Sequence, residues 1–176
     1  MRNKVATLLI TLLLPGCIAV QTVTITRQVS TEEAIARAAP QIRHQRAPRD
    51  SLAAEVGQRL NAERRARGLK SVSYNPQLST VARTHAAWLE GANVGLQHTN
   101  AQGASPMTRT RAAGYKACRS AENLARGQDS AEQVMRDWMA SDGHRANNLL
   151  PDVKEYGFAL HPTRNHWVLL LAAPGC

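Results

Sequence analysis

The sequence has few aromatic residues and no apolar run long enough to cross a membrane as a helix. Three tryptophans, three tyrosines and one phenylalanine are spread over 176 residues, and they are not interleaved with basic residues as on many nucleic-acid-binding surfaces. The longest mainly apolar run, Val5 to Leu14, has ten residues, whereas a membrane-spanning helix needs about 20. These absences argue against a nucleic-acid partner and against a spanning helix.

The start of the chain has the pattern of a cleaved export signal. Two basic residues precede the apolar run, whose length is typical of a signal-peptide core. The following Pro-Gly-Cys resembles a bacterial lipoprotein box, in which Cys17 would be lipidated, although Pro15 stands where a small residue is usual. We expect residues 1–16 to be removed. In a bacterium with two membranes, the usual sorting pattern of such lipoproteins favours the outer membrane, because Ile18 rather than Asp follows the cysteine. The alternative is a signal peptide that is cut later and carries no lipid.

Charge and cysteine count agree with export. The formal net charge is +9, and loss of Arg2 and Lys4 with the signal leaves +7, which favours anionic surfaces such as a bacterial envelope. If Cys17 carries lipid, Cys118 and Cys176 remain as an even pair in an oxidising compartment, where disulfides persist. We expect a bridge between them; two free thiols are the alternative.

The length allows one domain with a substantial core. Residues 17–50 change character repeatedly and are interpreted as a tether, and residues 51–176 as the folded domain. A first helix is predicted after Asp50, with apolar residues every fourth position and Gly68 as its C-terminal cap.

Two further helices and a hairpin are predicted. Asn75 and the proline after it begin a second helix that ends near Gly91, and His85 lies on its apolar face, where a packed histidine is the favoured interpretation. A capping box at Ser130 begins a third helix that is expected to end at Gly143. Near the end, "EYGFAL" and "HWVLLLAA" predict two strands of a hairpin, the second buried on both faces.

Helices first and strands last predict an α+β sandwich. Residues 94–128 show little regular pattern and are predicted to be a long loop, which at about 35 residues points to function. His98, Glu122 and His144 each lie near the end of an element, where side chains can converge. Their spacing matches no local metal motif such as H-E-x-x-H, so spacing alone is weak support for a site.

Several motifs in a fixed order resemble the CAP superfamily, the group of cysteine-rich secretory proteins, antigen 5 and pathogenesis-related 1. They are "LNAERRARGLKSVSYNPQLSTVARTHAAWL", "QHTN", "RAAGY", "AENLARG", "VMRDWMASDGHRAN", "YGFAL" and "HWVLLLA", and the resemblance extends over about residues 51–173. It implies a three-layer α-β-α sandwich whose cleft contains two histidines and two acidic residues. His98 and His144 match the histidines, and Glu122 matches one acid, with Ala121 in place of the usual glycine. Ser141 stands roughly where the second acid is expected, so no fourth member is assigned.

The resemblance leaves both the ligand and the chemistry open. Two imidazoles and a carboxylate suit Zn²⁺ with one open position, so His98, Glu122 and His144 are candidate zinc ligands; the alternative is a metal-free polar floor. No catalytic residue is assigned. We expect a monomeric, non-enzymatic envelope domain that binds a ligand or partner in the cleft. The alternatives are a metal-dependent hydrolase of peptide or cell-wall substrates and an adhesive domain that holds an anionic polymer.

Overall fold

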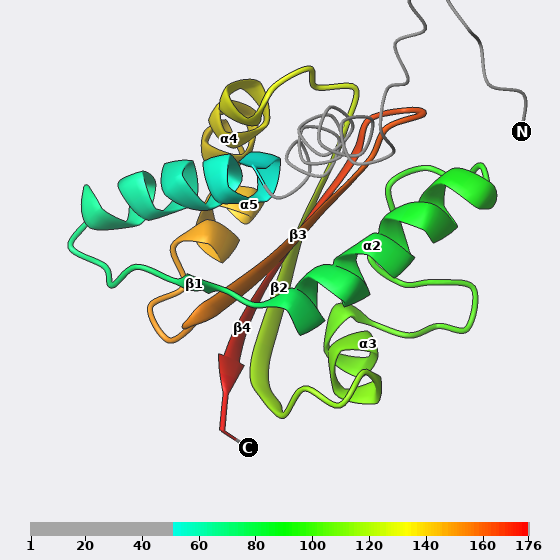
Figure 1. Cartoon of the computed structure of the whole chain (residues 1–176), viewed down its shortest axis with the longest axis horizontal. Helices are drawn as coiled ribbons and strands as arrows, with labels where there is room; N and C mark the ends of the chain where they lie inside the picture. The colour runs from blue at the N-terminus through cyan, green and yellow to red at the C-terminus, as the bar shows by residue number, and fades with distance from the viewer. Residues whose placement is uncertain (1–50, 176) are drawn as a thin grey trace, which may run out of the picture. The chain divides into compact units, whose positions relative to one another are not determined.

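The computed structural model describes residues 51–175, and these form three layers with a sheet in the middle (Figure 1). The predicted signal peptide, Cys17, the tether and Cys176 lie outside the described residues. Within residues 51–175, no helix combines the length and the apolar character needed to cross a membrane.

The first helix ends, and the second begins and ends, where the sequence predicts. Residues 51–65 are helical, and Gly68 follows with a positive φ of 72°. The Gly68 and Leu69 amides donate to the carbonyls of Arg65 and Arg64, both at 3.0 Å, which is the paired arrangement of a glycine C-cap. Helix α2 is Pro76–Gly91, and the Asn75 side chain accepts hydrogen bonds from the first two free amides that follow Pro76.

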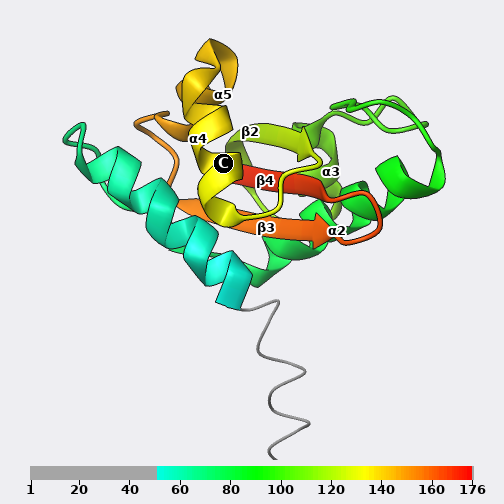
Figure 2. The same ribbon diagram turned by 90° about the horizontal axis from the view of Figure 1, so that it is seen from above.

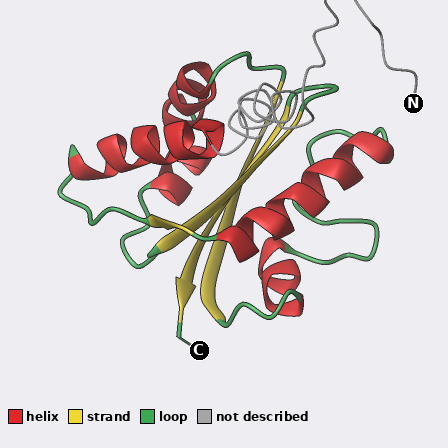
Figure 3. Cartoon of the chain, viewed as in Figure 1, coloured by secondary structure: helices red, strands yellow, loops and turns green. Residues whose placement is uncertain are grey.

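The sheet has four strands in the order β1-β3-β4-β2. They are β1 (Ser73–Tyr74), β2 (Ala117–Arg126), β3 (Glu155–His161) and β4 (His166–Pro174). Strands β3 and β4 form the predicted antiparallel hairpin, β2 pairs antiparallel with β4, and the short β1 pairs parallel with β3 (Figure 3). Strand β2 is therefore an edge strand.

Helices cover both faces of this sheet, as the predicted α+β sandwich requires. Helices α2 and α3 (Pro106–Ala112) lie on one face, and the first helix, α4 (Ala131–Ala140) and α5 (Asp142–Asn148) lie on the other (Figure 2). Successive residues of β4 alternate between the two layers: Val168 and Leu170 pack with α2, whereas Leu169 and Leu171 pack with the first helix and α4. All four are fully buried, which explains the nearly uninterrupted apolar run.

Two predictions about secondary structure are wrong. Residues 94–128 are not one loop, because they contain α3 and the ten-residue strand β2. The pattern was hidden because polar residues occupy buried positions of β2, Glu122 and Asn123 among them. The third helix ends at Ala140 rather than at Gly143, and Gly143 lies in the first turn of α5.

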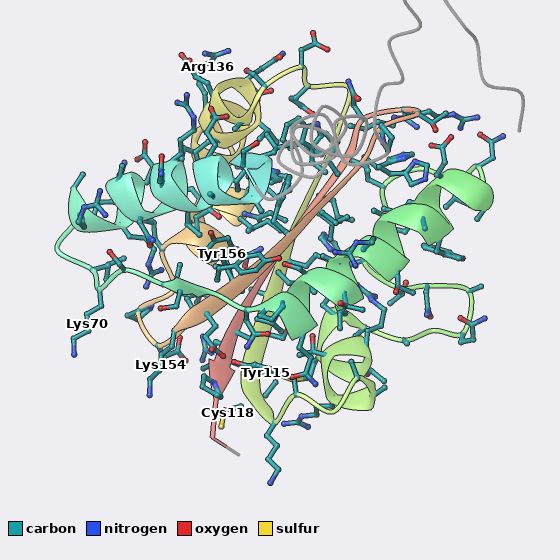
Figure 4. All side chains as sticks on the ribbon, viewed as in Figure 1. Lys70, Tyr115, Cys118, Arg136, Lys154 and Tyr156 are labelled. Carbon is teal, nitrogen blue, oxygen red and sulfur yellow. The ribbon has the colours of Figure 1, made fainter. Side chains whose placement is uncertain are left out.

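The end of β4 lies beside the beginning of β2. Ala117 is opposite Pro174, and the Gly175 amide donates to the Lys116 carbonyl at 3.0 Å. Cys118 lies at this end of the sheet (Figure 4). The predicted bridge to Cys176 stays a prediction, because Cys176 is outside the described residues.

Candidate functional site

Glu122 is the centre of the candidate site. It lies in the middle of β2 opposite Leu170, on the face of the sheet that α2 covers. Its side chain is 0 % exposed, and a buried carboxylate is strongly destabilising unless charged or hydrogen-bonding partners compensate it.

Arg109 supplies the compensating charge. One guanidinium nitrogen, Nη2, donates to Glu122 Oε2 at 2.5 Å, and the Arg109 side chain is itself only 8 % exposed. A proline and the Ser105 N-cap begin α3, which presents Arg109 in its last turn. This residue was not identified from the sequence, because one arginine in a basic chain carries no distinguishing pattern.

His98 contacts the other oxygen of the same carboxylate. Its Nδ1 lies 2.9 Å from Glu122 Oε1, and 53 % of the His98 side chain is exposed. A carboxylate paired with arginine only accepts hydrogen bonds, so Nδ1 carries the proton and donates. Nε2 is then the ring nitrogen left for a ligand.

His85 reaches the site from α2. It is buried, it stacks on Trp88 with ring centroids 5.3 Å apart, and its Nε2 lies 2.8 Å from the Gln97 carbonyl and 3.7 Å from Glu122 Oε1. Burial lowers the pKa of His85, partly opposed by the charge of Glu122. The packed histidine favoured from the sequence is confirmed, and it also fixes the chain next to His98. We call His85, His98, Arg109 and Glu122 the Glu122 cluster.

His144 approaches from the other layer across the edge of β2. The buried Asn123 amide donates to the His144 carbonyl and to the Asn148 side chain, both at 2.9 Å. The Asn147 side chain donates to Asn123 Oδ1 at 2.9 Å and to the Glu122 carbonyl at 3.2 Å. Adjacent residues of β2 thus hold the Glu122 cluster on one face and α5 on the other.

The His144 ring is half-buried and within electrostatic range of His98. Burial lowers the pKa of His144, and the neighbouring His98 lowers it further. The three residues selected from the sequence therefore come from β2 and from segments on both sides of it. Among residues 51–175, Glu122 is the carboxylate that pairs with a site histidine; Ser141 is the N-cap of α5 and makes no side-chain cap hydrogen bond.

The described side chains do not form the predicted three-residue zinc site. Within residues 51–175, no group of three or more histidine, cysteine, aspartate or glutamate side chains is arranged to hold a metal ion. The reason is visible at Glu122, whose two oxygens are bound by Arg109 and His98. A guanidinium on the carboxylate also opposes a second cation there. Glu122 does not fit as a direct ligand, and only the imidazoles retain free ring nitrogens.

Comparisons with known proteins agree with this fold. The sequence matches the family model of CAP, the cysteine-rich secretory protein family, over residues 58–172. This match includes well over half of the chain, so the protein belongs to the CAP family. A Bacillus subtilis (strain 168) protein named YkwD and described as uncharacterized is 31% identical over 113 residues. That match covers 64% of this chain and 44% of the relative, so this chain spans less than half of the relative's length.

Solved structures show the same fold at low identity. An outer surface protein from Borrelia burgdorferi superposes with a TM-score of 0.60 at 23% identity, over 66% of this chain and 87% of that protein. An extracellular protein with an SCP domain from Bacillus anthracis gives a TM-score of 0.67 at 15% identity, over 88% of this chain and 47% of that protein. These likenesses confirm the three-layer sandwich expected from the sequence.

Proposed function

We propose that this protein is an exported CAP domain that binds a ligand or partner at the Glu122 cluster without catalysing a reaction. The observation that carries the proposal is the state of Glu122, which is buried and paired with both Arg109 and His98. A general acid or base must exchange a proton with substrate, and the Glu122 side chain is 0 % exposed, so a substrate has no direct access to this carboxylate. Within residues 51–175, the cluster's hydrogen bonds join its members to one another and to main-chain carbonyls, rather than to a serine or cysteine nucleophile.

The alternative is a metal-dependent hydrolase, and an activity assay separates the two. The purified protein, with and without added zinc, would be incubated with a labelled peptide mixture and with cell-wall fragments. We expect no product above that of a His98→Ala variant. Hydrolysis by the parent that is lost in His98→Ala would replace the binding proposal with the hydrolase.

The metal part of the proposal involves the imidazoles alone. His98 and His144 would hold a zinc ion, with Glu122 behind His98 as the orienting carboxylate that metal-bound histidines commonly have. A zinc titration by calorimetry near neutral pH tests it, with His98→Ala and His144→Ala as site variants and His161→Ala as a control on a distant strand. Heat in the parent and control but not in the site variants is expected. No heat in the parent, or equal heat in all four proteins, would leave a metal-free site.

Adhesion to an anionic polymer through the basic surface is distinguished by salt. Attraction between exposed charges weakens as the Debye length falls from about 10 Å at 0.1 M to about 3 Å at 1 M salt. Binding at the Glu122 cluster should persist under these conditions and should depend on His98. Retention on envelope material that disappears in high salt and is unchanged in His98→Ala would support adhesion instead.

The location proposed is the bacterial envelope, with lipid on Cys17 holding the protein at the outer membrane. The support is the order of basic residues, apolar run and Gly-Cys at the start of the chain, together with relatives described as extracellular or outer-surface proteins. A Cys17→Ser variant should leave the membrane fraction. If it fractionates like the parent, lipid on Cys17 is not the anchor.

A further inference from the structure

Arg109 joins three segments of the site through one guanidinium group. Besides its bond to Glu122, Nη1 donates to the His98 carbonyl at 2.6 Å and to the Ala104 carbonyl at 2.8 Å. The chain between these two carbonyls is closed on itself by Asn100, whose side chain accepts from the amides of Gln102 and Ala104. Arg109 therefore binds both ends of the loop from His98 to Ala104 and also the Glu122 carboxylate.

We propose that Arg109 is the positioning residue of the Glu122 cluster: it locks Glu122 and the main chain of His98 together so that the His98 ring presents Nε2 to an incoming ligand. The inference deepens the proposed function, since it concerns how the same site is prepared. It does not depend on which ligand binds there.

The two oxygens of Glu122 have different partners, which supports this role. Arg109 takes Oε2, which leaves Oε1 for the His98 ring. The same guanidinium fixes the His98 carbonyl, so the ring and the carboxylate are held relative to each other from both sides. More than half of the His98 side chain is exposed, and an imidazole at such a position would otherwise rotate and exchange tautomers freely.

Arg109 is buried, so attraction between surface charges does not explain why an arginine stands at this position. Its side chain is almost enclosed, and its charge is matched by Glu122 alone among the described acidic residues. Arginine provides donors in a fixed planar fork, whereas lysine provides one mobile ammonium. A positioning role requires the planar guanidinium, because Nη2 binds the Glu122 carboxylate while Nη1 of the same rigid group binds the carbonyls of His98 and Ala104.

The chain offers a matched control in Arg111, two residues further along α3. Its guanidinium donates to the Ala117 carbonyl through two nitrogens at 3.0 and 2.8 Å. It has hydrogen bonds to main chain, as Arg109 has, but no bond to the Glu122 cluster. Loss of Arg111 should therefore disturb local structure without changing the His98 ring.

The test is the tautomer of His98, read from long-range proton–nitrogen NMR spectra of the full-length protein labelled with ¹⁵N and held above neutral pH. The His98 resonances are assigned by their loss in a His98→Gln variant. In the parent, the proton should lie on Nδ1. In Arg109→Gln, the ring should change to predominantly Nε2–H, the form that free imidazole side chains favour, whereas Arg111→Gln should keep the parent spectrum.

Two further variants keep the test decisive if Arg109→Gln does not fold. Arg109→Lys retains the charge but not the fork, and it should shift the tautomer partly. Glu122→Gln keeps one acceptor oxygen, which Arg109 would hold, and places an NH2 donor opposite His98 Nδ1, so it should shift the tautomer fully. An unchanged Nδ1–H tautomer in every folded Arg109 variant would overturn the proposal, as would an equal change in Arg111→Gln.

The readout is separable from the proposed function because no ligand is added. If zinc binds in the parent, Arg109→Gln should weaken it by about 10- to 100-fold, as is usual when a group that orients a metal-bound histidine is lost. If the protein binds no zinc, the tautomer result still decides the role of Arg109. Failure of the binding proposal and failure of the positioning proposal are thus different observations.

Discussion

Gly157 is the point where strand β3 touches helix α2, and replacing it with alanine should strongly destabilise the protein. A Cβ atom at this position would lie 2.2 Å from the main-chain carbon of Leu78 and 2.3 Å from the nitrogen of Ser79. Both are backbone atoms of the first turns of α2, so rotation of a side chain cannot relieve the overlap. The helix must move away from the sheet.

The magnitude follows from what that movement disrupts. Overpacking in a core that adjusts by side-chain shifts costs about 1–3 kcal/mol. Here the buried Phe158 amide also loses its partner, Ser79 Oγ at 3.0 Å, and an unsatisfied buried donor adds about 1–3 kcal/mol. We expect Gly157→Ala to lower the free energy of unfolding by about 3–5 kcal/mol, a large part of the roughly 5–15 kcal/mol typical of a whole domain.

Urea denaturation followed by far-ultraviolet circular dichroism measures this loss. The matched control is Gly91→Ala, at the last residue of α2, where an added Cβ meets nothing within 4 Å. Because alanine is the better helix former, the control should be neutral or more stable by up to about 1 kcal/mol. A Gly157→Ala protein within about 1 kcal/mol of the parent, below the lower end of the overpacking range, would refute the close-approach argument.

Three other measurements test the fold. Burial lowers the pKa of His166 despite its contact with Glu90, so the unfolded chain takes up the proton at a higher pH than the folded protein does. The unfolding free energy should therefore fall as the pH drops below about 6.5, by up to about 1.4 kcal/mol per pH unit. The slope should be smaller in His166→Gln. A bridge between Cys118 and Cys176 would stabilise the folded protein by on the order of 4 kcal/mol in the chain-entropy model. Mass spectrometry of the unreduced, unfolded protein after alkylation tests for the bridge, and two alkylated thiols would disprove it. Asn123→Ala leaves several buried groups without partners and should lose about 3 kcal/mol in urea denaturation, whereas a loss under about 1 kcal/mol would contradict its role in holding α5.

Two helix starts and one helix end were predictable because each depends on one residue with a local physical effect. Asn75 and Ser130 both cap helices through their side-chain oxygens, as their positions before apolar repeats indicated. Gly68 adopts the positive φ that its place after a helix implied. The β3–β4 hairpin was predictable for a similar reason, since two short apolar runs and the polar turn between them are properties of adjacent residues.

Strand β2 was not predictable by the same rules, because long-range contacts decide its structure. Its polar residues would ordinarily indicate a loop, but Glu122 is neutralised by Arg109 from α3, and Asn123 is hydrogen-bonded by α5. None of these partners is marked by a local pattern. The resemblance to the CAP family identified Glu122 without explaining its burial, and Arg109 required the three-dimensional structure.

The failure of the local rules at β2 is itself an argument about function. Replacing a buried ion pair with apolar residues of similar volume often leaves a protein equally or more stable, so stability alone gives little reason to retain Glu122 with Arg109. The pair lies directly beneath an exposed imidazole, and it holds the ring through one oxygen and the main chain through the guanidinium. Places where a sequence departs from its structural pattern are often functional sites. The departure here is concentrated on the residues that orient His98, which makes the His98 ring, rather than the carboxylate, the group expected to contact a ligand.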